Sequence, residues 1–457
     1  MSEMVYVIVD ETTYKAKEGS LLIDLLIKEN IKVPYFCYHE SLGADGNCRM
    51  CMVEIEGQKR PQIACDTLIK SGMKVRSKGE NIQKVRTDIL ELELINHPVD
   101  CPICDQAGEC SLQDFYMDYG LHNAKVTIAD KVKHSKHVDL GSNVMLDQER
   151  CVLCARCTRF TDKITHTHEL GIIGRGDDAK VSTMPGRKLS NPYAMNVVDL
   201  CPVGALTSKD FRFSQRVWFL QTANSICHGC AKGCNIYIDH NKIKYQDDVI
   251  YRFRPRRNDA VNGFFICDEG RLSYKELQEN RQEEIILHDN IITEDEALEQ
   301  IKNLIQEFKN NTIITIDANL YNEEIDAIVA FAKKIDAKVY SPLEIYMDEA
   351  FGDDMLKSSN RAANAKKIQN SNIRTETPAK TGLLINFNHP QKFEADETIN
   401  FATHKGKQAS LTLPVAVYSE NSGTLTNEDG LIQTCQKAVF KNNPTPTIIE
   451  YLIRLSS

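Results

Sequence analysis

Residues 150–160 read RCVLCARCTRF, a stretch in which Cys151, Cys154 and Cys157 follow one another at intervals of three. This spacing brings three thiols onto one tight loop. A fourth cysteine, Cys201, comes much later in the chain and is followed directly by Pro202. Three thiols on one loop favour metal ligands over disulfides, provided that the protein resides in a reducing compartment.

The chain has 457 residues, enough for about three domains with their own cores. No apolar run approaches the roughly 18 residues of a membrane span, and the net charge of -9 argues against a protein that binds nucleic acids regardless of sequence. The N-terminus, MSEMVYVIVDETTYKAKEG, alternates like a strand and lacks the basic start and apolar segment of a targeting peptide. We therefore expect a reducing compartment, where clustered cysteines are ligands or catalytic groups.

Fifteen of the sixteen cysteines fall into four groups, numbered here along the chain, and the last, Cys435, stands alone. The first site has Cys37, Cys48, Cys51 and Cys65, the second Cys101, Cys104 and Cys110, the third Cys151, Cys154, Cys157 and Cys201, and the fourth Cys227, Cys230, Cys234 and Cys267. His97 precedes the second group. A lone histidine before a proline is usually only a polar residue at a helix end, but imidazole can replace thiolate on iron–sulfur clusters. We predict His97 as the missing ligand, which completes four sites of four ligands each.

Zinc is the competing interpretation, because structural zinc also binds four thiolates, or three and one imidazole. Zinc sites usually show two short knuckles, whereas the third site has three close cysteines and a distant Cys-Pro, as in bacterial-type ferredoxins that hold a [4Fe-4S] cluster. At the first site, Gly43 and Gly46 suit a loop whose N–H groups turn toward cluster sulfur. By analogy with plant-type spacing, that site is interpreted as a [2Fe-2S] site.

The scaffold around the first site is predicted by periodicity. Val5 to Val9 and Tyr14 to Ala16 indicate a hairpin, Ser20 an N-cap, and Leu21 to Lys28 a helix with leucines facing inward, a small β-grasp pattern. A second helix is predicted from about Glu80 to Asn96. Its apolar set is Ile82, Val85, Ile89, Leu92, Leu94 and Ile95, and it would place His97 at its end.

The run from Met4 to about Arg271 resembles the N-terminal half of the G subunit of the bacterial proton-pumping NADH-quinone oxidoreductase, a relative of the 75 kDa subunit of mitochondrial complex I. The motifs that carry this resemblance are PYFCYHESLGADGNCRMCMVEI, HPVDCPICDQAGECSLQD, RCVLCARCTRF, DLCPVGALTSKDFRF, and CHGCAKGCN with FICDEGR. The resemblance implies one [2Fe-2S] cluster on the first site and [4Fe-4S] clusters on the second, with His97, and on the third. The fourth motif resembles that of molybdopterin oxidoreductases and implies a third [4Fe-4S] cluster.

The resemblance implies an α+β architecture of four parts. These are a β-grasp [2Fe-2S] ferredoxin-like domain at 1–78, an α-rich domain with two [4Fe-4S] clusters at 79–215, a molybdopterin-oxidoreductase-type [4Fe-4S] domain at 216–275, and a truncated, cofactor-free molybdopterin-like α/β domain at 276–457. Glu269 stands where molybdenum-containing relatives often have a basic residue, which fits the absence of molybdopterin.

Within the last part, Ile313 to Asp317, Glu323 to Lys334 and Lys338 to Tyr340 predict a βαβ unit, and Gly382 begins a buried strand. Val415 to Gln433 resembles the segment of molybdopterin folds in which a strand leads to a Gly-Thr-x-x-Asn turn. The polar stretch from Lys357 to Lys380 is interpreted as a surface loop or linker.

No arrangement for nucleophilic or acid–base catalysis and no nucleotide motif is evident, so one-electron transfer is the predicted function. The resemblance implies as partners a flavin-bearing NADH-binding subunit, a ferredoxin-like subunit with two [4Fe-4S] clusters and the quinone-module subunits, with no nucleic acid and no membrane span of its own. It implies a peripheral location on the cytoplasmic side of the bacterial inner membrane, in the hydrophilic arm. The alternatives are the diaphorase-side subunit of an NAD-reducing hydrogenase, a formate dehydrogenase α-subunit, or a zinc scaffold.

Several charged and aromatic residues remain outside these sites. Arg150, Arg156 and Arg159 flank the third site and either offset its charge or face solvent. The basic run Arg252, Arg254, Arg256 and Arg257 is interpreted as solvated or internally paired, with docking of an acidic partner as the alternative. We expect Trp218 to be a core residue, His166 and His168 to have no ligand role, and Cys435 to be a buried thiol.

Overall fold

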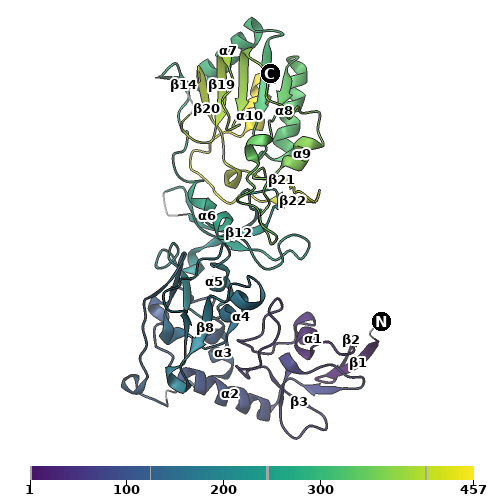
Figure 1. The fold of residues 1–457 in the computed structure, drawn as a ribbon, viewed down its shortest axis with the longest axis vertical. Coiled ribbons are helices and arrows are strands. Elements are labelled where there is room, and N and C mark those ends of the chain that lie inside the picture. The colour runs from purple at the N-terminus through teal and green to yellow at the C-terminus, as the bar shows by residue number, and fades with distance from the viewer. Residues whose placement is uncertain (1–2, 124, 243–245, 407–408, 457) are drawn as a thin grey trace. The chain divides into compact units, whose positions relative to one another are not determined.

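The computed structural model describes residues 3–123, 125–242, 246–406 and 409–456. The chain divides into two compact units, residues 1–219 and residues 220–457 (Figure 1), and each is described by itself. The first unit contains the first, second and third predicted sites. The second contains the fourth site and the C-terminal α/β region.

Unit 1 begins with a mixed five-stranded sheet in the order β2-β1-β5-β3-β4. The strands are β1 (Met4–Val9), β2 (Thr12–Lys17), β3 (Met52–Ile55), β4 (Gln62–Ile63) and β5 (Lys74–Arg76). β1 pairs antiparallel with β2 and parallel with β5, and its alternate valines pack in one core with helix α1 (Leu22–Lys28). The predicted hairpin and helix are confirmed, because a period of two and a period of about 3.6 each bury one apolar face.

The predicted N-cap of α1 is wrong by one residue. The N-cap is Leu21, and no side chain caps the helix. Ser20 lies in the preceding turn, where its hydroxyl donates to the carbonyl of Lys17 (2.7 Å). The hydroxyl therefore closes the turn before the helix.

Helix α2 (Glu80–Leu94) lies close to its predicted range, but its buried face differs from the prediction. The buried positions, one turn apart, are Ile82, Arg86 and Leu90. The predicted apolar residues Leu92 and Ile95 are instead 68% and 41% exposed. The Arg86 guanidinium donates to the Tyr119 hydroxyl (3.1 Å) and to the Met52 carbonyl (2.8 Å), so this buried cation ties the helix to β3.

The rest of unit 1 consists of short elements that frame the ligand loops. They are β6 (Val138–Gly141), β7 (Val144–Leu146), β8 (Leu170–Ile173), β9 (Lys180–Thr183), β10 (Leu206–Ser208), α3 (Ser111–Tyr119), α4 (Arg156–Lys163) and α5 (Asn196–Leu200). Strands β10, β7 and β6 form one sheet, and β8 and β9 form another. Because the elements are short, most of the predicted ligands lie in the loops between them.

Unit 2 begins with an antiparallel sheet in the order β11-β12-β13. Its elements are β11 (Gln221–Ile226), β12 (Asn235–Lys242), β13 (Asp248–Pro255) and the short helix α6 (Asp268–Leu272). The connection from β11 to β12 carries three cysteines of the fourth site, and Cys267 immediately precedes α6.

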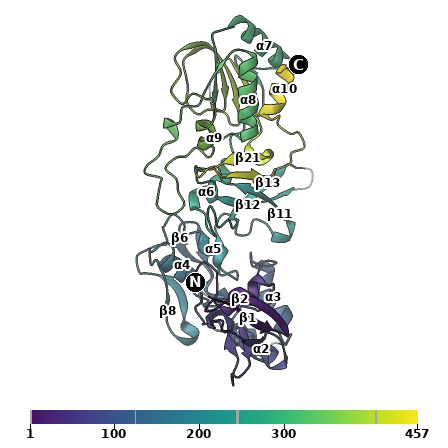
Figure 2. The same cartoon turned by 90° about the vertical axis from the view of Figure 1, so that its right-hand side faces the viewer.

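A seven-stranded sheet follows in the order β15-β14-β20-β19-β18-β16-β17. Its strands are β14 (Ile286–Leu287), β15 (Asn290–Ile291), β16 (Thr312–Ile316), β17 (Lys338–Tyr340), β18 (Thr381–Phe387), β19 (Ala395–Ala402) and β20 (Leu411–Pro414). The five strands from β20 to β17 pair in parallel. Its helices are α7 (Glu294–Glu307), α8 (Asn322–Lys334) and α10 (Ile448–Ser456), and α8 and α10 lie side by side (Figure 2). The βαβ unit and the buried strand β18 are confirmed.

Two predictions for unit 2 are wrong. Residues 357–380 are not a surface loop or linker: they contain helix α9 (Ala365–Gln369), and Asn364 is fully buried with hydrogen bonds to Leu320 and Thr426. The Gly-Thr pair predicted to form a turn begins strand β21 (Gly423–Thr426), which pairs with β22 (Ile432–Cys435). In both stretches polar side chains bond to partners from other parts of the chain, as Thr424 does with Asn322 and Glu323. Neither the polarity of residues 357–380 nor the resemblance of Val415 to Gln433 indicates these partners.

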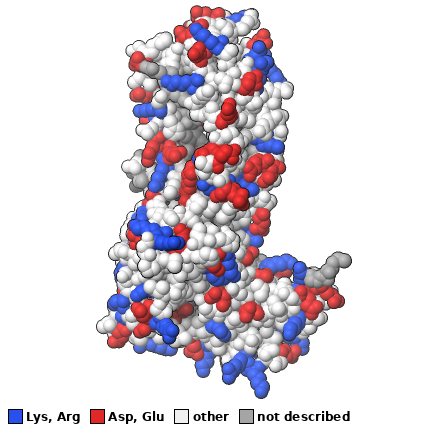
Figure 3. All heavy atoms as spheres, in the orientation of Figure 1, with Lys and Arg blue, Asp and Glu red and all other residues white. Residues whose placement is uncertain are grey.

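Among the described residues, no helix combines the length and apolarity that crossing a bilayer requires. On the face drawn in Figure 3, acidic and basic side chains are interspersed. The basic run after β12 is internally paired, as expected: Arg252 and Arg254 both bind the buried Asp239 (2.7 and 2.6 Å), and Arg257 binds Asp259 (3.0 Å).

Candidate iron–sulfur sites

The first site is a buried cluster of thiols, three from the connection between α1 and β3 and one from the turn that follows β4. Its cysteines are all at most 5% exposed: Cys37, Cys48, Cys51 and Cys65. Cys37 contacts the thiols of Cys48 and Cys65, and Cys65 in turn contacts Cys51. These contacts lower the pKa of Cys37 and raise that of Cys65. Thiols in mutual contact fit a small centre in which each metal atom takes two of them.

The loop around the first site is wound tightly. Gly43 and Gly46 have φ angles of 72° and 75°, the left-handed region that glycine adopts without strain. The Phe36 N–H donates to Cys48 Sγ (3.4 Å), and a backbone hydrogen bond from Gly46 lowers the pKa of Cys37. Such N–H groups stabilise negative sulfur, as the sequence predicts for this loop.

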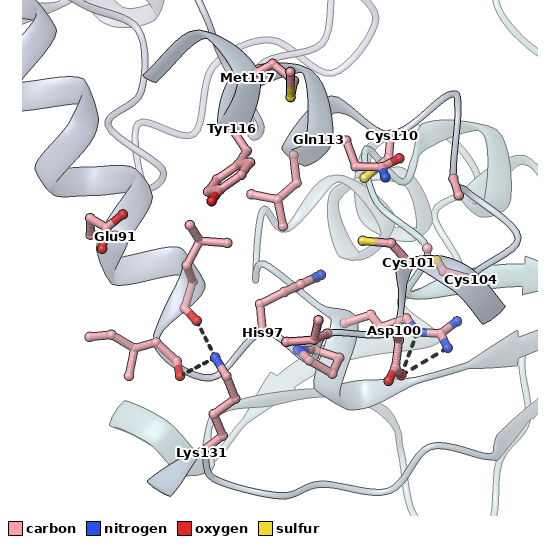
Figure 4. A pocket seen from close by; sticks show the side chains of 18 of the residues that line it. Glu91, His97, Asp100, Cys101, Cys104, Cys110, Gln113, Tyr116, Met117 and Lys131 are labelled. Carbon is pink, nitrogen blue, oxygen red and sulfur yellow. Dashed lines mark hydrogen bonds and ion pairs between the residues drawn. The ribbon is translucent and has the colours of Figure 1, made fainter. Parts of the chain in front are cut away.

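The second site lies where α2 ends (Figure 4). His97, Cys101, Cys104 and Cys110 line one cavity of about 980 Å³, which is otherwise largely apolar. Burial, together with the charges of Lys131 and Arg150, lowers the pKa of His97 to about 4. The imidazole is therefore neutral near pH 7, the form in which histidine binds metals.

Lys131, from a distant part of the chain, holds the end of α2 shortly before His97. Its ammonium donates to the carbonyls of Leu94 (2.7 Å) and Ile95 (2.9 Å), the unpaired acceptors at the end of α2 (Figure 4). In the wall of the cavity, Asp100 accepts from Arg150 (3.1 Å), and it also accepts from Lys136 (2.5 Å). Sequence reasoning missed these partners, because they join segments far apart in the chain.

A glycine shapes the second site. A Cβ atom at Gly204 would lie 2.1 Å from Cys104 Sγ, so only glycine lets this thiol take its position. Burial raises the pKa of Cys104, and that of Cys110 to about 11. Cys101, by contrast, is exposed at the rim. The thiols and the neutral imidazole thus surround a space that the backbone leaves open.

The third site is enclosed. Its four thiols line one small cavity with apolar residues such as Leu146, Val152 and Val203. Leu153 and Ala155, between the cysteines, have φ angles of 49° and 58°, which wind the loop tightly enough for its three thiols to line the same cavity. Burial raises the pKa of Cys154 to about 12, so metal binding at this site must displace protons.

Arg156 and Arg159, next to the third-site cysteines, are 9% and 8% exposed, which contradicts the solvent-facing alternative. Arg159 donates to the carbonyls of Cys37 and Gly43 in the first-site loop, the latter at 2.9 Å. Arg156 donates to the carbonyls of Tyr38 (2.6 Å) and Leu200 (3.2 Å). Two buried cations therefore join the first and third sites and offset the charge of bound thiolates.

The fourth site lies in unit 2, where β11, β12 and α6 meet. Cys227, Cys230, Cys234 and Cys267 line a cavity of about 620 Å³. The Gly229 N–H donates to Cys227 Sγ (3.4 Å) and the Gly270 N–H to Cys267 Sγ (3.3 Å). A Cβ atom at Gly270 would lie 2.9 Å from Cys227 Sγ. As at the first site, backbone N–H groups donate to sulfur, and the absence of a side chain at Gly270 leaves room for Cys227 Sγ.

The donor arrangement bears on the zinc alternative. Among the described residues, no three His, Cys, Asp or Glu side chains converge on a point that could hold one metal ion. A structural zinc needs four donors about 2.3 Å from a single centre. In a [4Fe-4S] cluster each thiolate binds a different iron, so the ligands surround a volume. The four thiols of the third site and the four of the fourth each line one cavity, an arrangement that a cluster would fill.

The structure also shows where the residues predicted to lie outside the four sites are found. Cys435 is fully buried, as expected, and contacts Ser225 and Tyr321. His166 and His168 lie on the surface and contact Asp162. The prediction for Trp218 is wrong: it is 59% exposed and stacks with Arg216, because it lies on a short turn rather than on an element that faces a core.

Four families match consecutive parts of the chain. They are a 2Fe-2S iron-sulfur cluster binding domain (residues 2–80), the NADH-ubiquinone oxidoreductase-G iron-sulfur binding region (86–125), the ferredoxin-like domain of NADH-quinone oxidoreductase subunit 3 (141–207) and the molybdopterin oxidoreductase Fe4S4 domain (220–279). Each match covers one of the four sites. The predicted α+β class, with its 2Fe-2S, 4Fe-4S and molybdopterin-oxidoreductase-type parts, is confirmed.

Individual relatives agree. The 75 kDa subunit of NADH-ubiquinone oxidoreductase from Reclinomonas americana is 35% identical over 82% of this chain and 57% of its own length. The G subunit of NADH-quinone oxidoreductase from Rickettsia typhi is 35% identical over 70% of this chain and 47% of its own. The chain thus spans about half the length of the curated relatives it matches. A chain of the solved NAD+-reducing [NiFe]-hydrogenase is 27% identical over 47% of this chain and 91% of its own, with a TM-score of 0.42, too low to establish a common fold.

Ferredoxin-type loops, four groups of cysteines and four iron–sulfur family matches define an iron–sulfur protein with 2Fe-2S and 4Fe-4S binding domains. The identity to the Reclinomonas and Rickettsia subunits extends beyond these domains over most of the chain. The chain belongs to the family that comprises the G subunit of NADH-quinone oxidoreductase and the 75 kDa subunit.

Proposed function

We propose that this chain is the iron–sulfur electron-transfer subunit of a proton-pumping NADH:quinone oxidoreductase, complex I. In this role it relays electrons from a flavin-bearing, NADH-binding subunit toward quinone. The similarity to the G subunit supports the proposal, and so do four sites built for clusters. The quinone-module subunits and a ferredoxin-like subunit with two [4Fe-4S] clusters are the further partners.

The observation that carries the proposal is a set of hydrogen bonds that joins the three ligand loops of unit 1. Asn47, beside a first-site cysteine, donates to the Leu153 carbonyl in the third-site loop (2.9 Å). The N–H of Ser111, beside a second-site cysteine, donates to the Pro202 carbonyl, beside a third-site cysteine (2.9 Å). The third site therefore touches both neighbours, and the proposed path runs from the first site through the third to the second.

The proposed cluster content is one [2Fe-2S] cluster at the first site and one [4Fe-4S] cluster at each of the other three, with no molybdopterin. When bound, these clusters supply one-electron oxidation and reduction. The residues of the chain would hold the centres in place: the cysteine thiolates and the neutral His97 would bind them, backbone N–H groups would stabilise their sulfur, and Arg156 and Arg159 would offset their charge. The apolar lining of the third site excludes water.

The fourth site distinguishes complex I from the alternatives. Diaphorase-side hydrogenase chains generally stop before this motif, whereas the chain matches the molybdopterin oxidoreductase Fe4S4 domain over residues 220–279. A formate dehydrogenase would need a large pterin domain. The proposed location is the cytoplasmic side of the bacterial inner membrane, peripheral and within the hydrophilic arm. A neighbouring gene for a flavin-binding subunit with a nucleotide site would support NADH as the donor.

Removing a ligand of the third site, which lies in the middle of the proposed path, tests the electron-transfer function. Cys154→Ala removes a ligand of the third site, so quinone reduction by NADH in the assembled complex should fall to background. NADH oxidation with an artificial acceptor that takes electrons directly from flavin should persist. Cys435→Ser, at a buried cysteine outside the four sites, is the control and should keep both activities. Unchanged quinone reduction in the Cys154→Ala complex would refute the relay.

A further inference from the structure

Residues 358–361 lie far along the chain from the fourth-site cysteines, yet they contact the ligand loop. A backbone hydrogen bond joins Ser358 to Cys230. The Ala231 N–H donates to the Asn360 carbonyl (2.8 Å), and Arg361 Nε donates to the Gly229 carbonyl (2.8 Å). This segment, expected from its polarity to be a linker, therefore forms part of the wall of the fourth site.

Arg361 also reaches the other ligand-bearing element. Its Nη2 donates to Glu269 Oε1 (2.6 Å), in the helix that begins after Cys267. Its guanidinium stacks over the buried ring of Phe351, 3.9 Å from the ring centroid, and Asp348 lies 3.8 Å away. One side chain thus bridges the loop of Cys227 and Cys230 and the helix of Cys267.

The charge of Arg361 reaches the sulfur atoms. The guanidinium interacts electrostatically with Cys227 and Cys230, and it lines the same cavity as the four thiols. A nearby cation favours the more negative, reduced form of a centre, and a nearby carboxylate opposes it. Arg361 is 32% exposed and Glu269 is 54% exposed, so solvent weakens but does not remove either effect.

We propose that Arg361 is a positioning residue of the fourth site, which clamps its two ligand-bearing segments together and raises the reduction potential of the cluster held there. Glu269 acts in the opposite direction. The inference rests on the proposed function, since it takes the fourth site to hold a [4Fe-4S] cluster. It gives the C-terminal region a role in electron transfer without a cofactor of its own.

The test compares charge variants in the full chain, purified anaerobically and poised at defined potentials for EPR. The fourth-site signal is identified by its loss in Cys234→Ala. In Arg361→Gln, the ratio of reduced to oxidised fourth cluster at a fixed potential should fall about tenfold, a shift of about 59 mV for one electron. Arg361→Lys, which keeps the charge, should restore most of this ratio.

Glu269→Gln should shift the ratio the other way, and a purely structural role for the pair predicts no such opposite signs. This variant leaves the bond from Arg361 to Gly229 in place, so it tests the inference even if Arg361→Gln loses iron. Arg374→Gln is the matched control, because Arg374 stacks on Tyr340 and pairs with Glu376. Unshifted potentials in both variants at full iron content would overturn the inference. If the wild-type chain lacks a fourth-site signal while the other clusters are present, the assignment of that site fails as well.

Discussion

Replacing Gly204 by alanine should dismantle the second site and spare the third. The new Cβ atom would lie 2.1 Å from Cys104 Sγ, whereas ordinary contacts begin at 3.4 Å. The thiol would therefore have to move by about 1.3 Å. Ligand positions in metal sites tolerate deviations of about 0.2 Å, so a shift of this size is incompatible with binding by Cys104. Forcing the extra atom into the packed loop should also cost about 1–3 kcal/mol of stability.

The assay is iron and sulfide content together with EPR of the anaerobically purified chain. The variant should lose about four of about 14 iron atoms and the signal that disappears in His97→Ala, while the third-site signal persists. Gly171→Ala is the matched control, since a Cβ atom there meets nothing within 4 Å. Full iron content with an unchanged second-site signal in Gly204→Ala would refute the geometric reasoning.

Three further outcomes are expected. His97→Cys should keep a four-iron cluster but lower its potential, because a thiolate adds one negative charge; an equal or higher potential in redox-poised EPR would contradict this. Arg159→Met should lower the free energy of unfolding by about 2–4 kcal/mol, since buried carbonyls of the first-site loop lose their donor. Denaturant titration against a variant of the exposed Arg187 checks this, and equal losses would argue against a specific bridge. Burial raises the pKa of Glu324 to about 7, above about 4.3 in the unfolded chain, so the folded state binds this proton more tightly. The contribution of this group to the free energy of unfolding is fully present below pH 4.3 and is lost as the pH rises through 7, by up to about 3.7 kcal/mol. Thermal unfolding of Glu324→Gln between pH 5 and 8 should show a flatter profile, and an identical slope would exclude this group as the cause.

The features that the sequence predicted depend on residues close together in the chain. The hairpin β1-β2 follows from alternating valines, and three of the four ligands at the third site fall within seven residues. His97 is inferred from its place before an incomplete cysteine group. In each case the pattern that predicts the element is contained in the element itself.

The features that the sequence did not predict join segments that only folding brings together. Lys131 caps the end of α2 from a later loop, Gly204 makes room for Cys104, and Arg361 bridges two parts of the fourth site. Arg86 is buried on a helix face where periodicity predicts only apolar residues. Each of these residues is polar or small, and its role depends on a partner that no local pattern indicates.

Iron and acid-labile sulfide analysis of anaerobically purified chain tests the central claim most directly. Four centres held by fifteen thiols and one imidazole predict about 14 iron and about 14 sulfide per chain, brown material and EPR signals from one two-iron and three four-iron clusters. Colourless protein with about four zinc and no iron or sulfide would contradict the account.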